Sequence, residues 1–391
     1  MTGRYRTGPW SDELGRVSAP ARTRSRSGLG GPSTRALGVW LASRVAVLLL
    51  TLAGARQLAG ERGWDGLVDR WDSWDVGLFR KVAESGYQGY PDAYPDRGVE
   101  AFFPGFPAVL RVVHLVVPSW TAAGLLVSLV AGGVASVALA RLAELDGIPG
   151  PRAVLVLVLS PYAVFLTAGY SEALFLALAL PGWLCARRGD WRAAGLLVAL
   201  ATTVRISGVF LALGLCVQYY VEHRSVRADA AWLLAPFAAL AAYFGYLWAI
   251  TGDPLRWQHV QQDYWGRSFT APWEALRATV AAARDPAQGT EYQWSFAAEV
   301  VAVAVGVALT VVLVRRARWG EATYVGLSVL ALATSSFYLS VARATLLWFP
   351  LWLIVAAAGD RRPALHTAYV AVCAPLMALG VLTFTAGRWV G

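Results

Sequence analysis

The chain has 391 residues, of which 57% are hydrophobic and 15% are charged, and its formal net charge is +9. A soluble protein of this length cannot bury so much apolar surface, so the composition excludes a soluble enzyme and indicates a polytopic membrane protein. In such a protein, cytoplasmic loops that meet anionic lipid head groups explain the excess of arginine. We therefore expect membrane lipids as partners and no nucleic acid.

Residues 1–34 are rich in Arg, Ser, Gly and Pro and lack an apolar period, which predicts a disordered cytoplasmic tail. Residues 35–391 are expected to form one all-α membrane domain. Its hydrophobic runs predict about 11 transmembrane or re-entrant helices, at 36–55, 120–140, 152–169, 172–186, 193–204, 207–221, 229–250, 296–314, 320–340, 345–358 and 365–386. Several runs are shorter than the roughly 20 residues that span a bilayer. For 102–117, two prolines and Arg111 favour an interfacial helix, with a true span as the alternative.

The positive-inside rule assigns a side to each loop, because short loops rich in Lys and Arg stay in the cytoplasm. With 102–117 left out of the count, the spans put the N-terminus and every arginine-rich stretch on the cytoplasmic side, namely 141–152, 187–188, 224–227, 315–318 and 361–362. The outer face then receives the large loop 56–101, the second loop 251–295, and the turns at Tyr170, Arg205 and Arg343. The residues suited to chemistry therefore fall together on the extracytoplasmic side of the cell membrane.

The first outer loop is rich in carboxylates set among aromatic residues. A carboxylate in such a loop is usually no more than a solvated surface residue. Asp75 differs, because Trp74 and Phe79 stand close to it in sequence and aromatic neighbours exclude water, which suits a general base. Asp72 precedes Asp75 by about one helical turn and can share the same site. We expect Asp75 and Asp72 to be the catalytic residues.

Charged residues also interrupt two of the apolar runs. Glu172 follows Tyr170 at the start of a span, where it either marks the beginning of a helix or faces a functional site, because an unpaired charge there is costly. Arg205 interrupts the run 196–217, and an arginine in such a run is a candidate for binding a phosphate or an acid. A structural ion pair between Arg205 and Glu172 is the alternative.

The second outer loop is dense in hydrogen-bonding and stacking groups between residues 252 and 268, among them Asp253, Trp265 and Arg267. Sugar hydroxyls bind such polar groups, and the apolar faces of sugar rings stack on aromatic side chains. The three cysteines and four histidines show no metal-binding spacing, and no nucleotide-binding glycine motif is present. We therefore expect no cofactor and no metal, and a sugar donor linked to a lipid.

Six elements, in order along residues 36–360, resemble the PIG-V mannosyltransferase family. The loop at 74–87 is similar to the family pattern WD-xx-[WL]-[YF]-xx-IA-xx-GY, and 101–107 is similar to AFFPLYP. The others are YSE-x-LF at 170–175, R-x-x-G at 205–208, the second outer loop at 252–268, and S-x-x-R…FP at 340–350. The chain departs from these patterns at Gly77 and Leu78, at Gly105 and at Ala344.

The resemblance implies a GT-C type glycosyltransferase fold and a polyprenyl-phosphate-mannose donor. By motif spacing, the carried-over base is Asp75. Arg205 and Arg343 would hold the donor phosphate, and Glu172 would orient the acceptor or pair with Arg205. The remaining residues expected to bind substrate are Tyr170, Asp253, Trp265 and Arg267. A divalent ion that bridges Asp72 and Asp75 to the phosphate is the alternative to a metal-free site.

The expected activity is an inverting transfer of a mannosyl or related residue to an envelope glycan, glycolipid or protein. The rival from another class is a transporter or flippase of a lipid-linked sugar. Two observations favour the enzyme. The sequence carries no detectable internal repeat, which many transporters have, and its polar groups concentrate on one side of the membrane.

Overall fold

The computed structural model describes residues 31–57, 66–88 and 98–391. The chain divides into two units, Met1–Gly31 and Pro32–Gly391, and the described helices belong to the second. The predicted tail over 1–34 falls almost wholly outside the described residues, and the first described helix begins at Pro32. Within the described ranges the chain is helical and contains no strand, apart from one isolated bridge between Phe269 and Ser335. The prediction of an all-α protein is confirmed.

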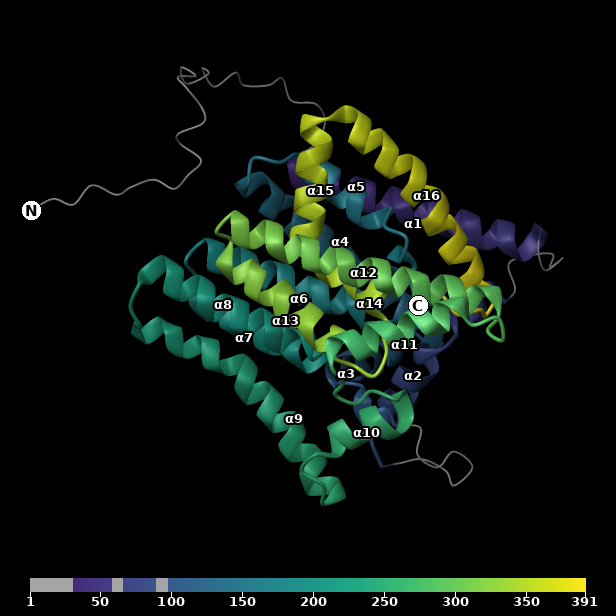
Figure 1. The fold of residues 1–391 in the computed structure, drawn as a ribbon, viewed down its shortest axis with the longest axis horizontal. Coiled ribbons are helices and arrows are strands. Elements are labelled where there is room, and N and C mark those ends of the chain that lie inside the picture. Colours follow the sequence, from purple (N-terminus) through teal and green to yellow (C-terminus); the bar gives the residue numbers. More distant parts are fainter. Residues whose placement is uncertain (1–30, 58–65, 89–97) are drawn as a thin grey trace, which may run out of the picture. The chain divides into compact units, whose positions relative to one another are not determined.

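The α-helices are labelled in Figure 1, and their bounds are α1 Pro32–Gln57, α2 Asp75–Ser85, α3 Gly105–His114, α4 Trp120–Leu145, α5 Gly150–Val158, α6 Ser171–Arg187, α7 Trp191–Val204, α8 Ser207–His223, α9 Ala235–Thr251, α10 Arg256–Trp265, α11 Pro272–Arg284, α12 Thr290–Arg315, α13 Trp319–Ala333, α14 Val341–Ala344, α15 Phe349–Arg361 and α16 Pro363–Thr385. Short 3-10 helices occupy Asp69–Trp71, Val99–Ala101, Ala163–Leu166, Ala228–Leu234 and Thr345–Leu347.

Five of the described helices are long and apolar enough to cross a membrane, namely Pro32–Gln57, Trp120–Leu145, Ala228–Thr251, Thr290–Arg315 and Pro363–Thr385. A sixth span is obtained when Val341–Leu347 and Phe349–Arg361, which meet at a bend of 75°, are taken together. The prediction of a polytopic membrane protein is confirmed. The other predicted spans correspond to shorter or interrupted helices. At 10 residues, α3 is shorter than the roughly 20 that span a bilayer, which agrees with an interfacial helix.

Three predicted spans are not continuous helices. The run 152–169 breaks after α5, because Pro161 cannot continue the helical hydrogen bonding and disfavours helical geometry in the residue before it. The run 320–340 stops being helical after α13 ends at Ala333. The run 345–358 bends at Trp348, where α15 begins with a proline in its first turn. Apolar composition alone does not reveal these breaks.

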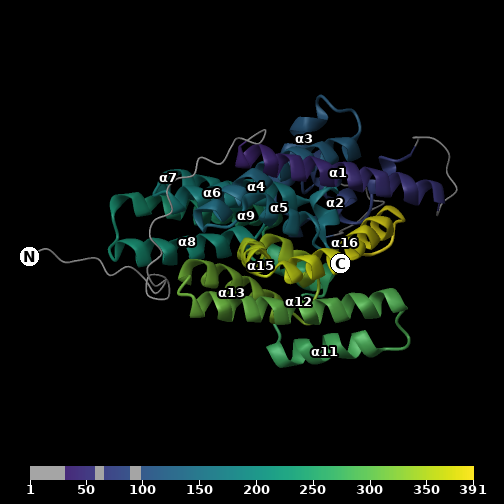
Figure 2. The ribbon, with the colours of Figure 1, turned by 90° about the horizontal axis from the view of Figure 1, so that it is seen from above.

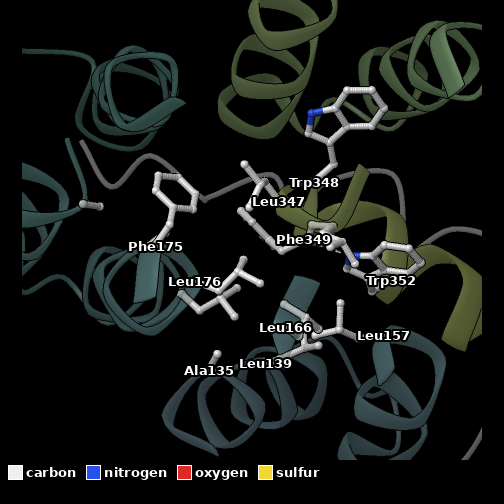
Figure 3. Close-up of a cluster of buried hydrophobic side chains, with 14 of the residues drawn as sticks. Ala135, Leu139, Leu157, Leu166, Phe175, Leu176, Leu347, Trp348, Phe349 and Trp352 are labelled. Atoms are coloured by element: carbon white, nitrogen blue, oxygen red, sulfur yellow. Dashed lines mark hydrogen bonds between the residues drawn. The ribbon is translucent and has the colours of Figure 1, made fainter. Parts of the chain in front are cut away.

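The core lies where α4, α5, α6 and α15 converge. Figure 3 shows Phe175 and Leu176 of α6 facing Leu347, with Leu139 of α4 and Leu157 of α5 nearby. Around this core, α6 packs on α4 and α7, while α8 packs on α13. Figure 2 shows α11 lying along α12, with which it is in contact. The helices thus hold their connecting turns in fixed positions at both ends.

Ion pairs join the turns at one end of these helices. The Asp146 carboxylate, after α4, accepts a hydrogen bond from Arg187 at 2.9 Å and lies 2.9 Å from Arg318 Nη2. Arg152 pairs with Asp360. These contacts bring together loops that the arginine count assigns to the cytoplasm, which supports their common side. The membrane side itself remains a prediction.

Candidate active site

Asp75 is the first residue of α2 and is 8% exposed. Its backbone N–H donates a hydrogen bond of 3.1 Å to the Tyr170 hydroxyl. Its Oδ2 accepts a hydrogen bond from Nη1 of Arg343 at 3.0 Å, although the two residues lie 268 positions apart in the chain. The fold thus supplies a buried carboxylate with a cationic partner.

A chain of alternating charges continues from Arg343. Glu172 is 0% exposed, and its Oε1 lies 3.3 Å from Nε of Arg343 and 2.8 Å from Nη1 of Arg205. The same Arg205 Nη1 donates to Ser171 Oγ at 2.6 Å. The Arg343 guanidinium also lies over the Tyr170 ring at 5.5 Å, in cation–π contact. Glu172 therefore fixes the positions of both arginines.

Arg205 reaches this site because the helix breaks around it. The residue is extended, with φ −153° and ψ 147°, between the end of α7 and the start of α8. The break is tightly packed, since a Cβ on Gly208 would lie 2.5 Å from the Cα of Thr202. Helix α3 approaches the same break, and a Cβ on Gly105 would lie 2.7 Å from Oγ1 of Thr203. Arg205 lies in the middle of an apolar run of the sequence, but the fold places it at the end of a helix.

Glu299 is a residue of the site that sequence reasoning missed. It lies on α12, is 2% exposed, and accepts hydrogen bonds from the backbone N–H groups of Ser340, Val341 and Ala342 at 2.7, 2.6 and 3.0 Å. Ser340 has a left-handed φ of 61°, so this turn is strained and needs support from its surroundings. Glu299 supplies that support and thereby sets the position of Arg343. The sequence does contain a signal for Glu299, because a carboxylate inside an apolar run is costly unless it has a partner.

Two cavities meet at Asp75. The arginine cavity, of about 480 Å³, has Asp75, Arg205, Arg267 and Arg343 as its charged lining residues. Burial lowers the pKa of Arg267 to about 10, and the nearby charge of Arg343 acts in the same direction. Glu172 pairs with Arg205 and Arg343 without lining the cavity. Among the charged groups that do line it, three guanidinium groups outnumber one carboxylate, which suits an anionic ligand.

The aromatic cavity, of about 590 Å³, also has Asp75 among its lining residues. Its charged lining residues are Asp75, Lys81 and Glu299. The aromatic lining residues are Trp74, Tyr264, Trp265, Tyr292, Phe296, Tyr338 and Trp389. Both cavities share Asp75, Trp265, Leu339 and Trp389, so these residues mark the boundary between them.

Two predicted residues lie apart from this cluster. Asp72 forms an ion pair of 2.6 Å with Arg80 and borders neither cavity. Asp253 receives a hydrogen bond of 2.7 Å from His259, which lowers the pKa of its carboxyl, and it also borders neither cavity. The predicted residues that the fold brings together are Asp75, Tyr170, Glu172, Arg205, Trp265, Arg267 and Arg343.

Comparison with known proteins finds similarity over part of this chain. Residues 54–227 match the family model described as mannosyltransferase (PIG-V). The chain is 37% identical over 159 residues to GPI alpha-1,6-mannosyltransferase 2 of Mus musculus, covering 37% of this chain and 31% of the mouse protein. Identity to the Rattus norvegicus protein of the same name is 40% over 151 residues, or 35% of this chain and 29% of the rat protein. The chain therefore spans about a third of the length of these curated relatives.

Proposed function

We propose that this chain, whose residues 54–227 match the PIG-V mannosyltransferase family model, transfers a mannosyl or related residue from a polyprenyl-phosphate sugar. The acceptor is a glycan, glycolipid or protein of the cell envelope. Transfer takes place on the extracytoplasmic face and inverts the anomeric configuration. The whole chain from 35 to 391 forms one GT-C type domain in this proposal.

The observation that carries the proposal is the position of Asp75 between two cavities of different chemistry. The arginine cavity suits the phosphate of the donor, because guanidinium groups form strong charge-assisted hydrogen bonds with phosphate oxygens. The aromatic cavity has Asp75 as a lining residue in common with the arginine cavity. A donor on one side and an acceptor on the other would thus meet at the carboxylate.

In the proposed reaction, Asp75 takes the proton of the acceptor hydroxyl as its oxygen attacks the anomeric carbon. The bond from that carbon to the phosphate oxygen breaks, and its electron pair stays with the phosphate. Arg205 and Arg343 stabilise the charge that grows on the leaving group. A phosphate leaves without being protonated, so one base suffices. The proton on Asp75 then passes to water.

Glu172 acts in this scheme as a positioning residue, because it is buried and borders neither cavity. Its carboxylate holds Arg205 and Arg343 at one oxygen. An arginine held in place in advance stabilises a developing charge without further reorganisation. The pairing of Arg205 with Glu172 and a role of Arg205 in phosphate binding are therefore compatible.

The direct test uses the purified chain in lipid nanodiscs with radiolabelled polyprenyl-phosphate-mannose and an envelope extract. We expect the label to move into an envelope product with an inverted linkage, as analysed by chromatography and glycosidase digestion. Unchanged donor after prolonged incubation, with neither transfer nor hydrolysis, would contradict the proposal.

Arg205→Lys is expected to weaken binding of the donor by about 10- to 100-fold, because lysine keeps the charge but loses the planar fork that bonds two phosphate oxygens. Donor affinity is measured by titration in nanodiscs. Arg188→Lys is the matched control, since Arg188 is exposed and borders neither cavity. Equal donor affinity of the Arg205 and Arg188 variants would remove Arg205 from the phosphate site.

A labelling experiment tests the predicted sides of the membrane. In a background with Cys185, Cys216 and Cys373 replaced, we expect Asp263→Cys to react with a membrane-impermeant maleimide added outside intact cells. Arg188→Cys is expected to react only after the cells are opened. Labelling of both positions from the same side would contradict the assignment of the active site to the extracytoplasmic face.

A further inference from the structure

The last residues of the described chain return to the first outer loop. Beyond α16, the carbonyl oxygen of Arg388 accepts a hydrogen bond of 3.2 Å from the indole N–H of Trp74. The ring of Trp389 meets the ring of Trp74 edge to face, with centroids 5.0 Å apart and planes at 74°. The Arg388 guanidinium pairs with Glu291 at the start of α12. The segment thus links the loop that carries Asp75 to α12.

Trp74 has a backbone conformation that calls for such support. Its φ is 58° and its ψ is −123°, a combination that a bulky side chain adopts only under constraint. Trp74 is 42% exposed, so burial in a core does not supply the constraint. The contacts with Arg388 and Trp389 do. Since Trp74 directly precedes Asp75, these contacts also fix the direction from which Asp75 enters α2.

Trp389 lies at the boundary of the two cavities together with Asp75. On the side of the aromatic cavity, Trp74 and Trp389 offer two rings at a steep angle beside the carboxylate. Aromatic rings present large apolar faces, to which the C–H faces of a sugar ring can pack.

The charges of the two cavities distinguish their ligands. The aromatic cavity has two carboxylates and one lysine among its lining residues, and both oxygens of the Glu299 carboxylate accept backbone hydrogen bonds. The arginine cavity has three arginines and one carboxylate. An anionic group therefore favours the arginine cavity, and a neutral, ring-shaped, hydroxylated group fits the aromatic one.

We propose that Trp74 and Trp389 bind a neutral sugar ring of the acceptor beside Asp75, so that the acceptor is a glycoside and the C-terminal segment determines its specificity. This inference rests on the proposed function. It adds to it the chemical class of the acceptor and a part of the site contributed from outside the region that matches the family model.

The experiment compares Trp389→Ala, Trp389→Leu and Trp389→Phe in nanodiscs with labelled polyprenyl-phosphate-mannose. Two rates are measured, namely hydrolysis of the donor by water and transfer to a panel of octyl glycosides. We expect the alanine and leucine variants to raise the KM for the octyl glycoside about 10-fold, because stacking is lost. The KM for the donor should change much less than the KM for the octyl glycoside, and phenylalanine, which keeps a ring next to Trp74, should restore most of the affinity for the acceptor.

Trp294→Ala is the matched control, because Trp294 lies on α12, is 74% exposed and borders neither cavity. Hydrolysis of the donor without transfer to any octyl glycoside would overturn the acceptor class while leaving the proposed function intact. A leucine variant with an unchanged acceptor KM, or a change confined to the donor KM, would overturn the role of Trp389. Absence of both hydrolysis and transfer in the unaltered chain would instead count against the proposed function.

Discussion

Asp75→Asn is expected to lower the rate of sugar transfer by about 100- to 10,000-fold, which is the usual contribution of a general base. Asparagine has nearly the same size as aspartate and can still accept a hydrogen bond from Arg343, so the fold around the site should persist. The rate is measured with labelled donor at saturating concentrations. The melting temperature of the variant in nanodiscs checks that the protein remains folded.

Asp72→Asn is the control for this variant, because Asp72 pairs with Arg80 and borders neither cavity. Loss of a partly exposed ion pair typically costs no more than about 1 kcal/mol and leaves the chemistry in place. We expect its transfer rate to stay within about tenfold of the unaltered chain, well short of the loss at a general base. If Asp72→Asn were inactive and Asp75→Asn active, the base would have to be reassigned.

Glu172→Ala is expected to lower the free energy of unfolding by about 3–5 kcal/mol, which is the typical result of removing one partner from a buried ion pair. The carboxylate is fully buried, and its loss leaves Arg205 and Arg343 without their shared partner. Reduced expression and a lower melting temperature in nanodiscs are the measurements. Activity should fall as well, since both arginines border the arginine cavity.

The double variant Glu172→Ala with Arg205→Ala separates structural from functional effects. We expect it to recover part of the lost stability, because one of the two stranded cations is gone while Arg343 remains. Transfer should not recover. Full recovery of both stability and transfer would mean that Arg205 serves only to neutralise Glu172.

Much of the architecture can be predicted from the sequence, because apolar runs and motifs are contiguous stretches of the chain. Apolar runs predict membrane helices, and the motif at residues 74–87 singles out Asp75 as the candidate base. The pairing of Arg205 with Glu172 is one of two interpretations that sequence leaves open, and the structure contains that pair. The short apolar runs predict that some spans are kinked or re-entrant, but not that the breaks fall near Pro161 and at Trp348, because a hydropathy pattern does not register where a helix bends.

The parts of the site that sequence did not predict depend on contacts between distant segments. Glu299 reads as a lone acid near the start of a span, and only the fold brings three backbone N–H groups of residues 340–342 to its carboxylate. Trp389 reads as a terminal aromatic residue, and only the fold brings it to Trp74. Asp72 is close to Asp75 in sequence, but its partner in the fold is Arg80.

The close approach at Gly105 bears on how segments could be exchanged between relatives. The motif of the PIG-V family carries leucine at this position, whereas in this chain a single Cβ there would lie 2.7 Å from Oγ1 and 2.8 Å from the carbonyl oxygen of Thr203. A chimaera that imports only the relative's 101–107 segment would therefore push apart α3 and the end of α7, two residues before Arg205. We therefore expect a functional chimaera to take both the 101–107 segment and the end of α7 from the same relative.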